Sequence, residues 1–81
     1  MKTKIKRHKD KNEYTIVMHP AEEGGYWVEV PALPGCYSQG ETMEETLDNI
    51  KDAIECHLMA LKKEGLRTPK DRTLVLSHVE V

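Results

Sequence analysis

Four segments of the chain alternate apolar and polar residues, a period of two that is typical of β-strands with one buried face. They run from about Asn12 to His19, from Tyr26 to Val30, over the short stretch Cys36–Ser38, and from Thr73 to Val81. In the first segment, Tyr14, Ile16 and Met18 fall on the same face. The turn Pro20–Gly25 has two glycines and separates the first two segments, so we expect these strands to form a hairpin.

The segment between the third and fourth strands has a different period. Its apolar residues recur every three or four positions, which predicts an amphipathic helix from about Met43 to Glu64. Thr42 and Glu45 have the spacing of a capping box, and Gly65 suits a left-handed stop. The apolar stripe comprises Met43, Leu47, Ile50, Ile54, Leu58 and Leu61. The order β-β-β-α-β therefore predicts an α+β fold, with a small three- to four-stranded sheet and one long helix on one face.

Proline and glycine interrupt the chain between the second strand and the helix. Pro31, Pro34 and Gly35 end the second strand, because proline has no N–H to donate and glycine adopts turn dihedrals easily. Gly40 then ends the extended segment that contains the third strand. We interpret the turn as a device that sets strand register, with Leu33 exposed at its tip.

One helix can cover only one face of the sheet, which leaves the other face open. Tyr26 and Trp27 are consecutive in a strand and must point to opposite faces. We expect Tyr26 to face the helix and Trp27 to lie on the open face near Glu29. Exposed aromatic residues are typical of binding hot spots. We therefore expect a second chain, either a copy of this protein or a different partner, to cover this face.

Size and charge narrow the possible partners. The 81 residues make one domain, 1–81, with a small core that contains one Trp and no Phe. The net charge of −2 is uneven, since residues 1–11 carry +5, residues 12–55 carry −9 and the remainder carries +2. We interpret residues 1–11 as a solvated, partly ordered basic segment, because no aromatic residue interleaves its lysines as a stacking platform. The acidic middle favours basic partners over nucleic acid.

Cysteine usage and hydropathy indicate a compartment. Cys36 and Cys56 do not make a disulfide framework, and we interpret them as free thiols in a reducing cytoplasm. The charged N-terminus is not followed by an apolar segment, and no run approaches the roughly 18 apolar residues of a membrane span. We expect a cytoplasmic protein without membrane association.

Residues that could carry catalysis or hold a metal are sparse. Two-metal nucleases need several converging carboxylates, whereas the predicted strands offer only Glu13, Glu29 and Glu80. The histidines show no ligand spacing, and the adjacent Cys56 and His57 point in different directions on a helix. We therefore expect no enzyme activity, no catalytic residue, no metal and no cofactor. A degenerate nuclease is the less favoured alternative.

The middle of the chain carries three motifs that form one block. They are Gly25-Tyr-Trp-Val-Glu-Val-Pro-Ala-Leu-Pro-Gly-Cys36, Ser38-x-Gly40-x-Thr42-x-Glu44-Glu45 and Leu47-x-Asn49-Ile50-Lys51-x-Ala53-Ile54. This block resembles the HicB family of antitoxins from bacterial and archaeal toxin–antitoxin pairs, and the resemblance covers roughly Tyr14 to Leu61. Two positions depart from the family pattern: Ala32 stands where an acid is frequent, and Thr46 stands where alanine is common.

The resemblance implies a fold and a function. The fold is partial ribonuclease-H-like, with a mixed sheet whose last strand runs parallel to the first. The function is to bind and block a small, basic, mRNA-cleaving HicA toxin with a double-stranded-RNA-binding-like fold. Many family members also carry a C-terminal DNA-binding domain. This chain ends at Val81, directly after the predicted fourth strand, so we expect a stand-alone domain without direct nucleic-acid binding.

These considerations give two groups of site residues and one alternative function. The candidate partner-binding residues are Trp27, Glu29, Leu33, Glu44, Asp48 and Asp52. The structural turn and cap residues are Pro31, Pro34, Gly35, Gly40, Thr42 and Glu45. The alternative is a stand-alone regulatory domain of the same fold that forms a homodimer or higher homo-oligomer and has no cognate toxin.

Overall fold

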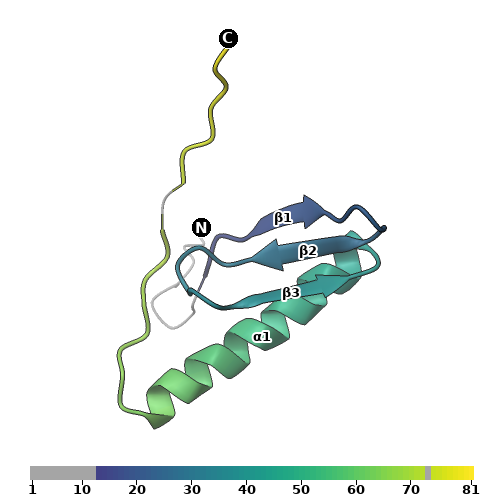
Figure 1. Cartoon of the computed structure of the whole chain (residues 1–81). Coiled ribbons are helices and arrows are strands. Elements are labelled where there is room, and N and C mark those ends of the chain that lie inside the picture. The colour runs from purple at the N-terminus through teal and green to yellow at the C-terminus, as the bar shows by residue number, and fades with distance from the viewer. Residues whose placement is uncertain (1–12, 73) are drawn as a thin grey trace, which may run out of the picture.

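Three strands form an antiparallel sheet with one long helix against one of its faces (Figure 1). The computed structural model describes residues 13–72 and 74–81. The elements are β1 (Val17–Pro20), β2 (Tyr26–Glu29), β3 (Tyr37–Gly40) and α1 (Met43–Lys63), and the strand order is β1-β2-β3. The predicted α+β class is confirmed. The predicted basic segment, residues 1–11, lies outside the described residues.

Two strand boundaries differ from the sequence pattern. The first strand begins at Val17 rather than near Asn12, a residue that itself lies outside the described part of the chain. The third strand is Tyr37–Gly40 rather than Cys36–Ser38, because the pairing of Tyr26 with Gly40 carries the ladder to the end of the hairpin. The helix agrees with its prediction to within one residue.

The prediction of a fourth strand is wrong for this structure. Residues 74–81, which we call the C-terminal arm, form no strand and run outward from the body of the protein (Figure 1). Alternation makes a sequence suitable for a strand, but a strand also needs a paired backbone. Because the arm pairs with no strand in the described residues, the sheet is wholly antiparallel rather than mixed.

The core lies between α1 and one face of the sheet. Its buried residues include Val28, Val30, Leu33, Cys36, Ile50 and Leu58. Tyr14, Ile16 and Met18 pack against this cluster, as their shared face predicts. The helix packs against β3 and β2, and its backbone makes no comparable approach to β1 in the described structure.

The predicted apolar stripe is only partly buried. Ile50 and Leu58 lie in the core, but the side chains of Met43 and Leu47 are 57% and 46% exposed. The stripe is therefore left uncovered at its N-terminal end. The physical reason is that α1 packs against only two of the strands, so one flank of the helix has nothing over it.

Local hydrogen bonds define the two ends of the helix. Thr42 Oγ1 accepts from the Glu45 amide at 3.0 Å, while Glu45 Oε1 accepts from the Glu41 amide at 2.8 Å. The predicted capping box is thus present, with its return bond to the residue before the cap. At the other end Gly65 has φ of 73°, a left-handed conformation that glycine adopts without steric cost.

Candidate functional site

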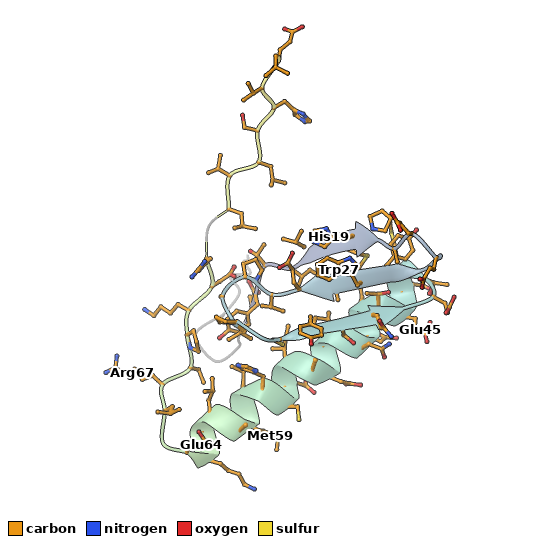
Figure 2. All side chains as sticks on the ribbon, in the orientation of Figure 1. His19, Trp27, Glu45, Met59, Glu64 and Arg67 are labelled. Atoms are coloured by element: carbon orange, nitrogen blue, oxygen red, sulfur yellow. The ribbon has the colours of Figure 1, made fainter. Side chains whose placement is uncertain are left out.

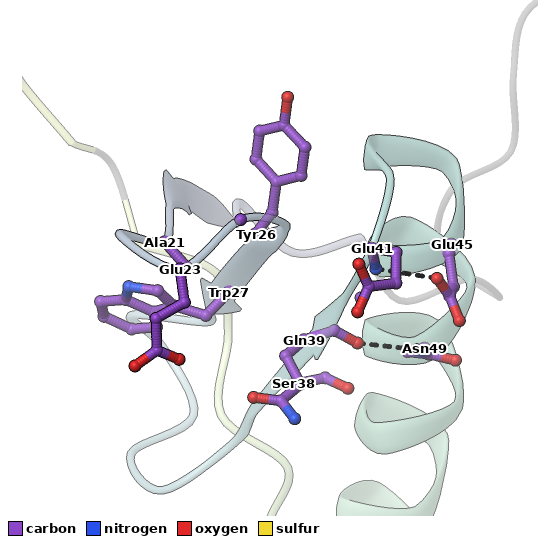
Figure 3. Close-up of a pocket in the computed structure, with 11 residues that line it drawn as sticks. Ala21, Glu23, Tyr26, Trp27, Ser38, Gln39, Glu41, Glu45 and Asn49 are labelled. Atoms are coloured by element: carbon purple, nitrogen blue, oxygen red, sulfur yellow. Dashed lines mark hydrogen bonds between the residues drawn. The ribbon is translucent and has the colours of Figure 1, made fainter.

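An aromatic cluster occupies the face of the sheet that α1 leaves open. Tyr26 and Trp27 point in opposite directions from β2 (Figure 3), and Trp27 is 40% exposed. His19, the cross-strand neighbour of Trp27, stacks on the indole with ring centroids 4.1 Å apart and an angle of 14° between the planes. His19 Nε2 also lies 2.7 Å from Glu29 Oε2. The predicted placement of Trp27 near Glu29 on the open face is confirmed.

This cluster holds the indole in a fixed orientation. Glu29 follows Trp27 by two residues and therefore shares its face, and its carboxylate holds the His19 ring through the contact with Nε2. A stacked aromatic pair contributes about 0.5–1.5 kcal/mol beyond area burial. The result is a flat aromatic surface that loses little conformational entropy when a partner covers it.

An open hollow lies beside Trp27, where the β1–β2 turn meets the start of α1 (Figure 3). Its lining residues are Ala21, Glu23, Gly24, Tyr26, Trp27, Ser38, Gln39, Gly40, Glu41, Glu45 and Asn49. Three of these are glutamates, and none is lysine or arginine. We call this feature the acidic hollow. It combines negative charge with two aromatic side chains, which is the chemistry that recognises a cationic side chain.

Two side chains of the acidic hollow are held in place by the backbone. The Glu45 carboxylate accepts from the Glu41 amide at 2.8 Å, and Asn49 Nδ2 donates to the Gln39 carbonyl at 2.7 Å (Figure 3). The second bond ties β3 to α1 across the floor of the acidic hollow. These bonds make the wall on the helix side preformed.

The predicted partner-binding residues do not form one surface. Trp27 and Glu29 lie together on the open face of the sheet. Glu44, Asp48 and Asp52 are exposed and follow one another at intervals of four residues along α1, on the side turned away from the core residue Ile50. The helix lies between these two groups, so they face opposite sides of the molecule. Figure 2 shows Trp27 on the sheet and Met59 on the helix.

The expectation that Leu33 is exposed is wrong, because this side chain is 0% exposed and lies in the core. Two hydrogen bonds fold the turn inward, from the Leu33 amide to the Val30 carbonyl and from the Cys36 amide to the Leu33 carbonyl, each at 2.9 Å. A buried residue cannot meet a partner, so Leu33 is a structural residue.

Sequence reasoning did not select Glu23 or Glu41, although both line the acidic hollow. These residues lie in different connections, and the hairpin register that pairs Tyr26 with Gly40 brings the connections together. The sequence signal that could have found them is the length of the segments between the predicted strands, which indicates the residues that face each other across a hairpin. It places the residues before Tyr26 and after Gly40 at the same end of the sheet.

A second set of polar contacts ties the chain after α1 to the segment before β1. The Thr15 amide and hydroxyl donate to the two Asp71 carboxylate oxygens at 2.8 and 2.7 Å, and the Tyr14 hydroxyl donates to the Pro69 carbonyl. We call these contacts the latch. The Thr15 amide, and then its hydroxyl, hold the pKa of Asp71 below its usual value. Burial, and then the Asp71 charge, raise the pKa of Tyr14.

The acidic residues of the described chain do not gather into an ion site. Among residues 13–72 and 74–81, no three His, Cys, Asp or Glu side chains lie close enough to hold a metal. Of the three glutamates assigned to strands, only Glu29 lies in one, and its carboxylate contacts His19. The same residues include no helix of the length and hydropathy needed to cross a bilayer. Both cysteines are free, and burial raises the pKa of the Cys36 thiol.

Comparison with known proteins gives a consistent result. The family model described as "HicB_like antitoxin of bacterial toxin-antitoxin system" matches residues 14–79. A UPF0150 protein of Thermoplasma acidophilum is 48% identical over 59 residues, which cover 73% of this chain and 86% of the relative. A UPF0150 protein of Synechocystis is 57% identical over 56 residues, 69% of this chain and 77% of the relative.

A UPF0150 protein of Helicobacter pylori is 42% identical over 60 residues, which cover 74% of this chain and 83% of the relative. The family match includes the strands, the turn, the helix, the latch and most of the C-terminal arm. On these grounds the chain belongs to the HicB-like antitoxin family.

Proposed function

We propose that this protein neutralises a small, basic, mRNA-cleaving toxin of the HicA type by binding directly to it. Membership of the HicB-like antitoxin family supports an antitoxin role that acts on a toxin. The observation that carries the finer proposal is the acidic hollow beside an exposed, oriented tryptophan. Binding, rather than chemistry on the toxin or its RNA, is the function that this surface supports.

Charge gives the first step of recognition. Residues 12–55 carry a net charge of −9, and that segment contains every residue of the acidic hollow. Complementary potentials accelerate encounter and select basic partners. A ribonuclease must itself attract RNA phosphates, so its working surface is basic. An acidic antitoxin that covers this surface competes with RNA for the same cationic side chains.

Contact inside the acidic hollow gives the second step. A lysine or arginine of the toxin would enter between Glu23 and Glu41, with its charge near the carboxylates and its stem against Trp27. A cation close to an aromatic ring gains about 0.5–2 kcal/mol, more when water is excluded. The hydrogen bond that already orients Glu45 lowers the ordering cost on this side of the interface.

Co-expression and affinity measurements test the proposal with the small basic protein encoded in the neighbouring reading frame. We expect the wild-type chain to rescue growth and to bind the purified toxin. The double variant Glu23→Lys, Glu41→Lys should weaken binding at least tenfold. The matched control, Asp48→Lys with Asp52→Lys, makes the same charge change on the outer surface of α1 and should change binding less than threefold.

Two results would contradict the proposal in different ways. Absence of both binding and rescue by the wild-type protein would remove the toxin-neutralising function. If the Asp48 and Asp52 changes weakened toxin binding more than the Glu23 and Glu41 changes, the toxin would bind the outer surface of α1 instead. Circular dichroism of each variant checks that the fold is intact.

The second candidate function is a homo-oligomeric regulatory domain of the same fold. The observation that favours it is the exposure of two aromatic side chains, Trp27 and Tyr37, on the open face. A copy of the same chain could cover these residues. Co-expression with the toxin separates the two functions, since a regulatory domain without a cognate toxin would neither bind it nor rescue growth.

A further inference from the structure

The C-terminal arm exposes apolar side chains that a folded protein ordinarily covers. Val75, Leu76 and Val79 are 86%, 89% and 81% exposed, and the arm stands clear of the sheet and the helix (Figures 1 and 2). The arm is rich in β-branched and aliphatic residues and contains neither proline nor glycine. Its sequence therefore suits a strand, and it lacks only a strand to pair with.

An unpaired strand edge is present in the same molecule. β1 is the outer strand of the β1-β2-β3 sheet and pairs on one side only, with β2, in the described structure. The backbone N–H and C=O groups on its outer side are therefore open to another strand. A free edge of this kind is a template for strand addition, and proteins usually cover it or block it.

An apolar hollow lies between one flank of α1 and Tyr14, in the segment that leads into β1. It is lined by Tyr14, Ile50, Lys51, Ile54, Glu55 and Leu58. Leu47, one turn before Lys51 on the same flank of α1, is 46% exposed. A strand added outside β1 would place alternate side chains over this hollow. The C-terminal arm offers alternating apolar residues for these positions.

The latch determines where the arm starts. Because Asp71 is bound to Thr15 and Pro69 to Tyr14, the chain passes beside the segment that leads into β1. From there the C-terminal arm turns away from its own sheet (Figure 1). Eight extended residues span roughly 26 Å, about twice the length of the four-residue strand β1, so the arm is long enough to pair with the whole of a β1 edge.

We propose that two copies of this protein exchange their C-terminal arms, each arm pairing as an edge strand with β1 of the other copy. Every copy carries both an unpaired arm and an unpaired edge. A two-fold dimer therefore pairs each arm with the β1 edge of the other copy. The exchange completes a four-stranded sheet in each copy and covers the apolar hollow. The open face with Trp27 is not used, so this inference does not depend on the toxin.

Crosslinking tests the exchange directly. In a Cys56→Ser background, one preparation carries Val17→Cys in β1 and a second, differently tagged preparation carries Ser77→Cys in the arm. After mixing and refolding, a short bis-maleimide should give a covalent heterodimer. The control replaces Ser77→Cys with Met59→Cys, which is exposed on the helix and should give none. Buried Cys36 is common to all the chains.

Two further measurements use the protein without added cysteines. Light scattering should give about twice the chain mass of 9.3 kDa. Leu76→Pro removes a backbone donor in the arm and should raise the dimer dissociation constant at least tenfold, whereas Leu76→Val should leave it within threefold. Both variants should keep the helical circular dichroism of the wild type.

Three outcomes would overturn the proposal. One is a wild-type protein that stays monomeric at high micromolar concentration. Another is a dimer that Leu76→Pro does not weaken, since its interface would lie elsewhere. The third is a chain carrying both Val17→Cys and Ser77→Cys that crosslinks only within itself, because the arm would then pair with its own β1.

Discussion

Gly40 and Thr46 approach each other so closely that a Cβ atom at Gly40 would lie 2.7 Å from Thr46 Oγ1 and 2.8 Å from the Thr46 backbone nitrogen. The last residue of β3 therefore rests directly on the first turn of α1. This contact sets how near the sheet lies to the helix. Gly40 also helps to line the acidic hollow.

Gly40→Ala should destabilise the protein by about 1–3 kcal/mol, the usual cost of overpacking a tight contact. Urea unfolding followed by circular dichroism measures the change. The double variant with Thr46→Ala is the informative control. It removes the hydroxyl, but the backbone atoms of Thr46 remain in the way, so it should recover little of the lost stability. Full recovery would show that the contact is limited by the side chain alone.

Thr42→Ala should cost about 1 kcal/mol, because it removes the side-chain acceptor for the Glu45 amide at the helix N-terminus. Thr42→Ser keeps the oxygen and should cost clearly less. Thermal unfolding of the three proteins gives the comparison. If Thr42→Ser were as unstable as Thr42→Ala, the methyl group rather than the hydrogen bond would be the stabilising part.

Substitutions of Trp27 and Leu33 should affect toxin binding and stability differently. Leu33 is fully buried, so Leu33→Ala should cost about 2–5 kcal/mol of unfolding free energy. Trp27→Ala leaves the core intact and should cost less stability, but it should weaken toxin binding by at least about 2 kcal/mol, as hot-spot truncations do. Calorimetry of binding and urea unfolding test the pair. Equal binding by wild type and Trp27→Ala would remove the indole from the interface.

The latch should open in acid. The folded-state pKa of Asp71 lies below its unfolded value of about 3.9, so its contribution to stability is present above that pH and is lost as the pH falls through the folded-state pKa. The Thr15 amide resonance should therefore shift in an NMR titration with a midpoint below about 3.9. Asp71→Asn should remove this transition. A midpoint at or above that value would mean that the Thr15 bonds do not form in solution.

The sequence predicted those features that depend on neighbouring residues. The length of α1, its cap at Thr42 and its stop at Gly65 follow from spacing within a few turns. The opposed directions of Tyr26 and Trp27 follow from the strand period alone. The family match supports the overall identification, because the motifs that carried the resemblance lie within residues 14–79.

Features that depend on distant residues were not predictable in this way. Leu33 is buried by two turn hydrogen bonds that no periodicity reveals. The acidic hollow arises from the register between β2 and β3, which places Glu23 and Glu41 in the lining of the same hollow. The C-terminal arm shows the same limit, because alternation identifies a potential strand but does not say which edge it joins.

Trp27 lies on the opposite side of the molecule from Asp48 and Asp52, and this placement has a consequence for stoichiometry. A ligand on the open face of the sheet and a ligand on the outer side of α1 would approach from opposite directions and would not collide. A single copy of this protein can therefore sit as the middle layer of a ternary assembly.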